Sequence, residues 1–215
     1  MAQIFISHSA KDTQPLEFLN RAFATTNVQA KHEEIEAIVS GSRTALQIRA
    51  DISASHAIMV LLGPHADALK HTRDWVVWES GNASGIGKDI WVLEAFEDSP
   101  NLSVVIPHLR HYVGFHYTDP WLIYLRQIIA SYDDSQAIKT LATTTGLGAL
   151  LGEGPGALIG GGIGLLLAAS TQPKAPPGLP MTCPQCRSFY NAHISAPAMR
   201  CPVCNAAIRF EVPTQ

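Results

Sequence analysis

One acidic side chain, Glu79, occurs within an otherwise apolar helical pattern. The apolar side chains that fall within about 60° of it on a helix are Trp75, Val76, Ala83 and Ile86. Burying an unpaired carboxylate is costly, so such a group is paired, is neutralised, or faces a cleft where a ligand replaces water. Glu79 is therefore a candidate catalytic residue. The alternative is that the helix is rotated or displaced and that Glu79 is an ordinary solvated acid.

The cysteines form two Cys-x-x-Cys pairs that are separated by 14 residues near the end of the chain: Cys183, Cys186, Cys201 and Cys204. In a reducing compartment this spacing favours metal over disulfides, and four thiolates would close a tetrahedral structural Zn²⁺ site of the zinc-ribbon type. No coordination position would stay open for catalysis. A segment of about 35 residues cannot bury a sufficient core, so the metal would supply its folding free energy. The alternative is a pair of redox dithiols.

Polar side chains end the first predicted strand, which covers residues 3–8. Ser7 and Ser9 are candidate hydrogen-bond donors to a ligand at that point, and His8 lies between them. A histidine after a strand is more often a packed residue than a catalyst. We therefore assign all three to a candidate substrate-binding rim, without a catalytic role for His8.

Strands and helices alternate over the first 130 residues. Strand patterns cover residues 3–8, 27–32, 57–62 and 89–94, with a possible edge strand at 111–116; helical patterns cover about 13–26, 43–53, the Glu79 segment and 119–131. The continuous apolar run at 57–62 indicates a strand that is covered on both faces. The alternation predicts an α/β fold with a parallel sheet and ligands beyond the carboxyl ends of its strands. Glu79 would have to face that rim to be catalytic.

Three motifs in residues 1–135 resemble those of a prokaryotic TIR (Toll/interleukin-1 receptor) domain. They are IFISHS at residues 4–9 with Lys11-Asp12 after it, the apolar strand 57–62 closed by Gly63-Pro64, and DWVVWE at residues 74–79 leading into strand 89–93. The resemblance implies a flavodoxin-like parallel five-stranded sheet. It also implies that the loop after the second strand, at about 33–42, serves self-association and covers the pocket, although its sequence departs from the family's commoner pattern.

The resemblance to enzymatic TIR domains implies a role for Glu79, because there the glutamate of a W-x-x-x-E motif is the catalytic residue of NAD hydrolysis. Trp75, one turn earlier, would lie beside it and contact the substrate. Nicotinamide leaves from a ring that is already cationic, so one carboxylate that stabilises the oxocarbenium-like ribose is sufficient. The products would be nicotinamide and ADP-ribose, or a cyclic variant; the sequence leaves both open.

Glycines recur every four residues in a nearly uncharged segment at 141–169: Gly148, Gly152, Gly156, Gly160 and Gly164. On a helix this spacing makes a flat face that another backbone can approach closely, and it resembles a glycine zipper. Each glycine costs a helix in water about 1 kcal/mol relative to alanine. The segment therefore predicts membrane association or tight self-packing. Because Glu153 and Pro155 interrupt it, a single span, a membrane hairpin, a soluble oligomerising hairpin and a flexible linker stay open.

Composition and order place these motifs in four parts: a TIR domain at 1–135, the glycine-zipper segment at 141–169, a Pro-rich linker at 170–180 and a zinc ribbon at 181–215. Charged residues make up 15% of the chain and the net charge is −3, which argues against nucleic acid as a partner. The first residues enter a strand pattern directly and do not resemble a signal peptide. We expect a cytoplasmic protein that associates with a membrane through the glycine segment, if at all.

These observations favour an NAD glycohydrolase that self-associates through its TIR domain and glycine segment. The resemblance to prokaryotic TIR effectors implies an immune effector that depletes NAD. One alternative is a non-catalytic adaptor in signal transduction. Another is a membrane-permeabilising effector whose TIR domain senses a nucleotide.

Overall fold

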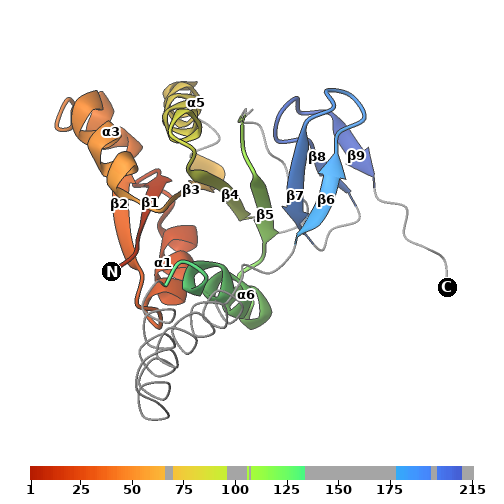
Figure 1. Cartoon of the computed structure of the whole chain (residues 1–215), viewed down its shortest axis with the longest axis horizontal. Helices are drawn as coiled ribbons and strands as arrows, with labels where there is room; N and C mark the ends of the chain where they lie inside the picture. Colours follow the sequence, from red (N-terminus) through yellow and green to blue (C-terminus); the bar gives the residue numbers. More distant parts are fainter. Residues whose placement is uncertain (66–69, 96–105, 107, 134–177, 195–197, 210–215) are drawn as a thin grey trace, which may run out of the picture.

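A seven-stranded, mostly parallel sheet forms the centre of the molecule (Figure 1). The computed structural model describes residues 1–65, 70–95, 106, 108–133, 178–194 and 198–209. The strand order is β2-β1-β3-β4-β5-β7-β6, and every neighbouring pair is parallel except β7 and β6. The first five strands in this order have the 2-1-3-4-5 arrangement of flavodoxin-like sheets. Such sheets bind ligands at the topological switch point between β1 and β3, where the order of the strands reverses.

The first five strands lie where the sequence predicts them. They are β1 (Gln3–His8), β2 (Gln29–Glu34), β3 (Ala57–Leu62), β4 (Asp89–Ala95) and β5 (His111–Phe115). All six residues of β3 are buried, as expected for a strand that is covered on both faces. The predicted α/β class is confirmed with a mostly parallel sheet, but the expected number of five strands is wrong: the sheet has seven, because β7 and the antiparallel β6 extend it.

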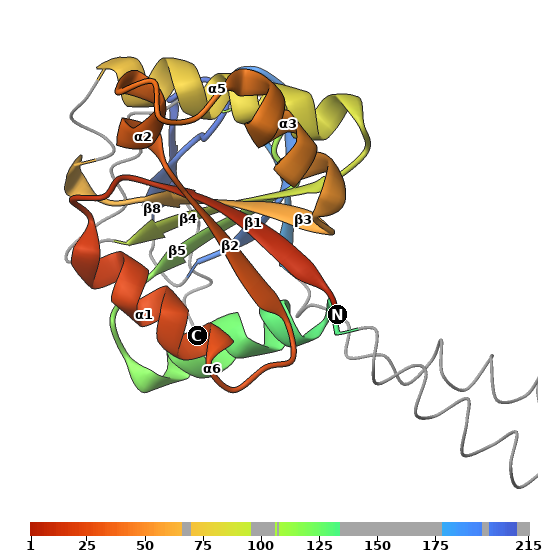
Figure 2. The ribbon, with the colours of Figure 1, turned by 90° about the vertical axis from the view of Figure 1, so that its left-hand side faces the viewer.

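Helices cover both faces of the sheet (Figure 2). They are α1 (Thr13–Phe23), α2 (Ile35–Val39), α3 (Ala45–Ala54), α5 (Lys70–Gly85) and α6 (Asp119–Ala130). One face carries α1 and α6, and the other carries α2, α3 and α5. α2 lies within residues 33–42, where the sequence predicts a loop, so that prediction is wrong for Ile35–Val39. α3 begins with a reciprocal capping box between Thr44 and Gln47.

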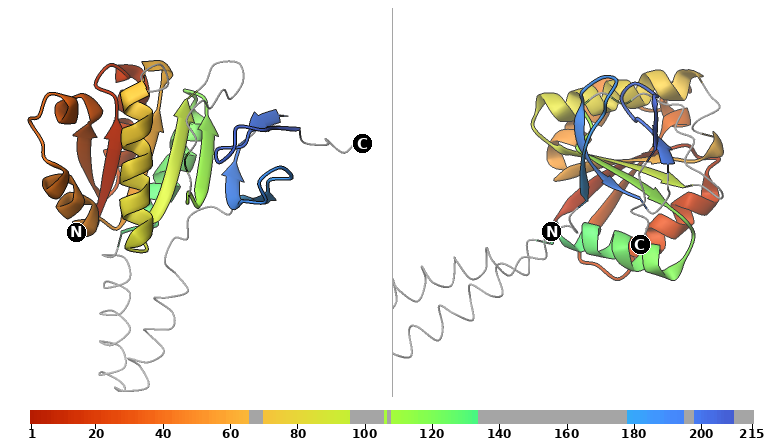
Figure 3. Two further views of the ribbon diagram at one scale, coloured as in Figure 1. Left: turned by 90° about the horizontal axis from the view of Figure 1, so that it is seen from above. Right: turned by 90° about the vertical axis from the view of Figure 1, so that its right-hand side faces the viewer.

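The cysteine-containing segment contributes two further strands to the same sheet. β7 (Phe189–His193) pairs in parallel with β5, and β6 (Leu179–Thr182) pairs antiparallel with β7. β8 (Ala198–Arg200) and β9 (Ala207–Arg209) form a separate hairpin. We call residues 179–209 the cysteine ribbon. Seen from above, it lies against the β5 side of the sheet (Figure 3). The prediction of β5 as an edge strand is therefore wrong: β5 lies between β4 and β7.

Two apolar layers fill the space between the sheet and its helices. Ile4 and Ile6 of β1 pack on the α1 and α6 side, whereas Phe5 packs on the α5 side. This alternation is the two-residue period of a strand with both faces buried. The layer on the α5 side continues into the cysteine ribbon, where it includes Tyr190 and Cys183.

The glycine segment at 141–169 and nearly all of the Pro-rich linker at 170–180 lie outside the described residues. Within the ranges that the structure describes, every helix is too short or too polar to cross a bilayer.

Candidate functional site

Glu79 is completely buried on the face of α5 that packs against the sheet. Two of the apolar residues predicted to lie on the same side of the helix, Val76 and Ala83, are also fully buried. Trp75 is half-buried, whereas Ile86, near the end of the helix, is 43% exposed. Glu79 is thus not the solvated acid of the alternative interpretation.

Two potential hydrogen-bond donors adjoin the Glu79 carboxylate: the Ser7 hydroxyl at the end of β1 and the Trp75 indole one turn earlier in α5. Burial raises the pKa of Glu79 to about 8, and Ser7 and Trp75 offset only part of this effect. Both donors are near enough to act on the carboxylate electrostatically, but by distance and angle neither contact qualifies as a hydrogen bond. Ser7 Oγ, Trp75 Nε1 and both oxygens of Glu79 are buried and have no hydrogen-bond partner among the described residues. Burial therefore favours the protonated form of Glu79.

A second buried carboxylate, Glu33, adds to burial in raising the pKa of Glu79. Glu33 is 3% exposed and lies next to Ser7 in the register of β2 and β1. Arg43, in the loop between α2 and α3, places Nη2 3.0 Å from Oε2 of Glu33 and also pairs with Asp51 of α3. A cation therefore compensates the charge of Glu33 close to the candidate catalytic acid.

The other predicted rim residues have different partners. The Ser9 hydroxyl donates a hydrogen bond to Glu36 of α2, which also accepts one from the Ala10 backbone N–H at 2.9 Å. His8 packs edge-on against His32, with ring centroids 5.5 Å apart, and its Nδ1 lies 3.2 Å from the Ser9 carbonyl oxygen. The structure thus brings Ser7 and Trp75 to Glu79, whereas Ser9 fixes the position of α2.

A cavity of about 400 Å³ lies at the carboxyl ends of the strands. Its lining includes Lys11, Thr13, His65 and Tyr117. Glu79 is not among the described residues that line it. The cavity occupies the rim where flavodoxin-like sheets bind their ligands.

Asp12 fixes the shape of this rim. Its carboxylate is buried and accepts a hydrogen bond from the His65 backbone N–H at 2.9 Å. A Cβ atom at Gly63 would lie 2.5 Å from Asp12 Cγ, so only glycine allows this approach. The Gly63-Pro64 end of β3 therefore has a packing role that the sequence did not reveal.

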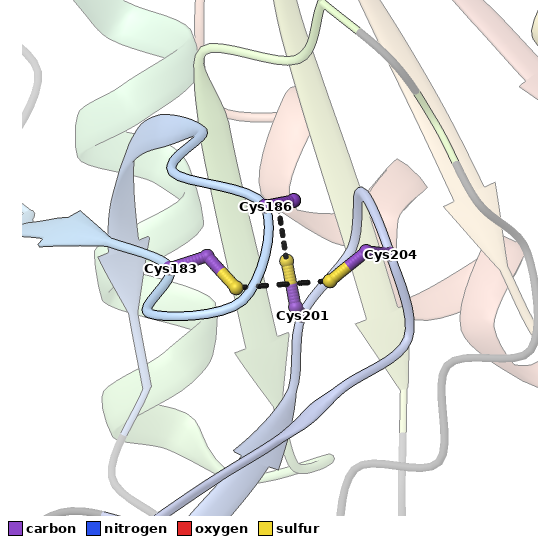
Figure 4. Close-up of side chains that lie close together, drawn as sticks. All are labelled: Cys183, Cys186, Cys201 and Cys204. Carbon is purple, nitrogen blue, oxygen red and sulfur yellow. Dashed lines mark hydrogen bonds between the residues drawn. The ribbon is translucent and has the colours of Figure 1, made fainter.

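The four cysteines lie close together in the cysteine ribbon (Figure 4). All four sulfur atoms lie within 4.8 Å of one another; Cys183 and Cys204 are 3.7 Å apart, and Cys186 and Cys201 are 3.9 Å apart. A tetrahedral ion with metal–sulfur bonds of about 2.3 Å requires sulfur–sulfur distances of about 3.8 Å. These separations are far longer than a disulfide bond of about 2.05 Å. The cluster could therefore hold a metal ion, as the spacing predicts.

The two Cys-x-x-Cys turns have the same backbone geometry. The N–H of Arg187 bonds to the Cys183 carbonyl at 2.9 Å, and the N–H of Asn205 bonds to the Cys201 carbonyl at 2.8 Å. Both residues have a positive φ, 57° for Arg187 and 61° for Asn205. Each turn thus curls its two cysteines towards the same point.

Two further side chains, Ser188 and Tyr190, lie next to the cysteines. The Ser188 hydroxyl lies 3.3 Å from the Cys186 sulfur and lowers the pKa of that thiol to about 6, which favours the metal-binding thiolate. Tyr190 is buried beside the cluster, and burial together with Cys201 raises the pKa of its phenol. Its hydroxyl has no partner among the described residues.

Sequence reasoning missed Glu33 and Arg43. Glu33 lies in the polar run QAKHEE, which gives no apolar alternation to show that one of its acids is buried. Arg43 follows Glu33 by ten positions, and the two side chains meet only because the intervening chain folds into α2. A local pattern contains no sign of this contact.

The fold and these sites define an α/β protein with a flavodoxin-like strand order, a buried acid at the strand ends and a four-cysteine cluster on an extension of its sheet. A comparison with protein-family models, curated proteins and solved structures found no match for the chain.

Proposed function

We propose that the protein is an NAD glycohydrolase of the TIR type and that Glu79 is its catalytic residue. The observation that carries the proposal is the state of Glu79: completely buried, adjoining Ser7 and Trp75, with both carboxylate oxygens unpaired among the described residues. Structural acids are normally paired when they are buried, whereas unpaired and perturbed acids concentrate at functional sites.

A cationic substrate would shift Glu79 from its protonated form towards its ionised form. The nicotinamide ring of NAD carries a positive charge, and a nearby positive charge favours the ionised form of a carboxyl group. Binding of NAD would therefore lower the pKa of Glu79 from about 8 and produce the carboxylate where it is needed. The ionised group then stabilises positive charge on the ribose as nicotinamide leaves.

Other residues of this chain have supporting roles in the proposal. Ser7 and Trp75 orient the carboxylate, because each has a donor that faces it and lacks another partner among the described residues. The rim cavity, of about 400 Å³, has the size of a ligand pocket and carries Lys11, whose charge suits the phosphates of the nucleotide. Glu79 is not among its described lining residues, so NAD bound there would have to extend beyond the cavity to bring its ribose to Glu79.

We further propose that the four-cysteine cluster holds a structural Zn²⁺ ion. Cys183, Cys186, Cys201 and Cys204 would hold the ion, and four thiolate ligands would leave no coordination position for a substrate. Metal analysis of the purified chain should then give one zinc per molecule. Less than about a tenth of that amount, after purification without chelators, would contradict this assignment.

Turnover of NAD by the full-length chain tests the proposed activity. The protein is incubated with NAD at high protein concentration, which favours self-association, and nicotinamide release is followed by chromatography. The proposal predicts stoichiometric release of nicotinamide with ADP-ribose or its cyclic form. No release by folded, zinc-loaded protein under these conditions would favour the non-catalytic signalling adaptor.

A further inference from the structure

The cysteine ribbon is built into the sheet through its strand β7. β7 and β5 pair from His111 with Asn191 to Val113 with His193, and the Asn191 N–H donates to the Arg110 carbonyl at 2.9 Å. β5 therefore has a hydrogen-bonded strand on each side. Without β7 it would be an edge strand.

The same junction is apolar on the α5 side. Tyr190 and Ala192 of β7 lie in one buried cluster with Tyr112 of β5, and the cluster includes Cys183 and Cys201. The metal-binding thiols and the sheet thus share a core. This shared core therefore links the cysteine cluster to the packing of β5.

A backbone hydrogen bond connects the second cysteine turn directly to the chain ahead of β5. The Ile106 N–H donates to the carbonyl of Pro202 at 2.8 Å, and Ile106 is completely buried. Pro202 lies between Cys201 and Cys204 and moves with their turn. The cysteine cluster consequently fixes a point of the α/β domain that lies outside β5 itself.

On the opposite face, the side chain of His193 holds β7 against the domain. His193 is 3% exposed, its Nε2 lies 3.3 Å from Nδ1 of His111, and its Nδ1 bonds to the Tyr124 hydroxyl of α6. His111 in turn stacks on Trp91 of β4, with ring centroids 3.8 Å apart and an interplanar angle of 9°. β7 is therefore fixed on both faces of the sheet.

We propose that metal binding by the four cysteines keeps β5 an interior strand, so that loss of the metal exposes β5 as an open edge of the sheet. β7 lies between the two cysteine turns in the chain, and so small a ribbon relies on its metal for folding free energy. The metal site thereby controls the integrity of the α/β domain in addition to that of the ribbon. This inference does not depend on whether the protein cleaves NAD.

Hydrogen exchange with and without metal tests the inference on the full chain. Amide exchange in residues 111–115 is measured by mass spectrometry in zinc-loaded protein, after chelation, and after zinc is restored. We expect chelation to speed exchange of the β5 amides by about tenfold or more, and zinc to reverse the change. Unchanged protection of β5 after chelation, while residues 183–204 exchange rapidly, would overturn the proposal.

Two variants separate docking of β7 from metal binding. Ala192→Glu places a charge in the shared core, where Ala192 is 2% exposed, without changing a cysteine. It should still bind cobalt(II) with a tetrathiolate spectrum but show fast exchange in β5. Phe189→Ser is the matched control, because Phe189 is 65% exposed on the same strand and should leave β5 protected. A cobalt-loaded Ala192→Glu variant with a fully protected β5 would contradict the proposal.

Discussion

Arg43 forms an ion pair with the buried Glu33 carboxylate at 3.0 Å, and this pair lies beside the unpaired acid Glu79. The loop between α2 and α3 thus supplies a cation to the buried Glu33 carboxylate. Glu33 nevertheless adds to burial in raising the pKa of Glu79.

Arg43→Met should destabilise the protein by about 2 kcal/mol at pH 7, because it leaves Glu33 buried without a partner. Breaking a fully buried ion pair costs roughly 3–5 kcal/mol, and we expect a smaller loss here because Arg43 is partly exposed. Urea unfolding measures the change. The double variant Glu33→Gln/Arg43→Met should recover most of the loss, since no charge is then buried. A double variant as unstable as Arg43→Met would show that Arg43 acts through packing alone.

The raised pKa of Glu79 predicts a stability that falls with rising pH. Between the unfolded pKa of about 4.5 and the folded pKa of about 8, the folded state binds the proton more tightly, so each step up in pH favours unfolding. Glu79→Gln removes this effect and should be more stable than the native protein above pH 8, by an amount on the order of 4 kcal/mol. The two proteins are compared by urea unfolding at pH 5 and pH 9. If Glu79→Gln and the native protein differed in unfolding free energy by the same amount at pH 5 and pH 9, the raised pKa of Glu79 would be contradicted.

His193 predicts the opposite trend at acid pH. Burial and the neighbouring His111 lower the pKa of His193 to about 4, so the unfolded state binds more protons between pH 6.5 and 4 and stability is lost as the pH falls through that range. As the pH falls from 6.5 to 4, the free energy of unfolding of His193→Gln should decrease by about 2 kcal/mol less than that of the native protein. Thermal unfolding across this range gives the comparison, with His116→Gln as a control on a partly exposed histidine. An unchanged acid loss in His193→Gln would refute the prediction.

Arg187 and Asn205 allow a matched test of the cysteine turns, because both have a left-handed backbone and only their side chains differ. Glycine adopts this conformation without strain, and asparagine tolerates it better than arginine does. Arg187→Gly should stabilise the zinc-loaded protein by about 0.5–1 kcal/mol, and Asn205→Gly by less. Thermal unfolding with zinc measures both. A larger gain at Asn205 would mean that backbone strain does not decide the effect.

Parts of the fold with a strong local pattern could be predicted from the sequence. The continuous apolar run of β3 and the spacing of the four cysteines each depend on residues that are close in the chain. The burial of β3 is confirmed, and the four cysteines lie close enough together to hold a metal ion. The helical period placed Glu79 on the same stripe as Val76 and Ala83 but left open whether it is buried or solvated; the structure shows that all three are buried.

Long-range pairing could not be predicted in the same way. β5 and β7 are joined by backbone hydrogen bonds and by the packing of Tyr190 and Ala192 against Tyr112, about 80 residues away in sequence. No local period contains that contact, so β5 was expected at an edge. Glu33 illustrates the same limit, because only the folded loop brings Arg43 to it.

Nicotinamide release by the variant Glu79→Gln tests most directly whether Glu79 is the catalytic residue of NAD cleavage. The variant keeps the shape of the side chain but cannot carry the charge that stabilises the ribose, so we predict that kcat falls by about 100-fold or more. Glu17→Gln, the same substitution at an exposed position of α1, should match the native protein. A folded Glu79→Gln variant that retains full NAD turnover would contradict the assignment.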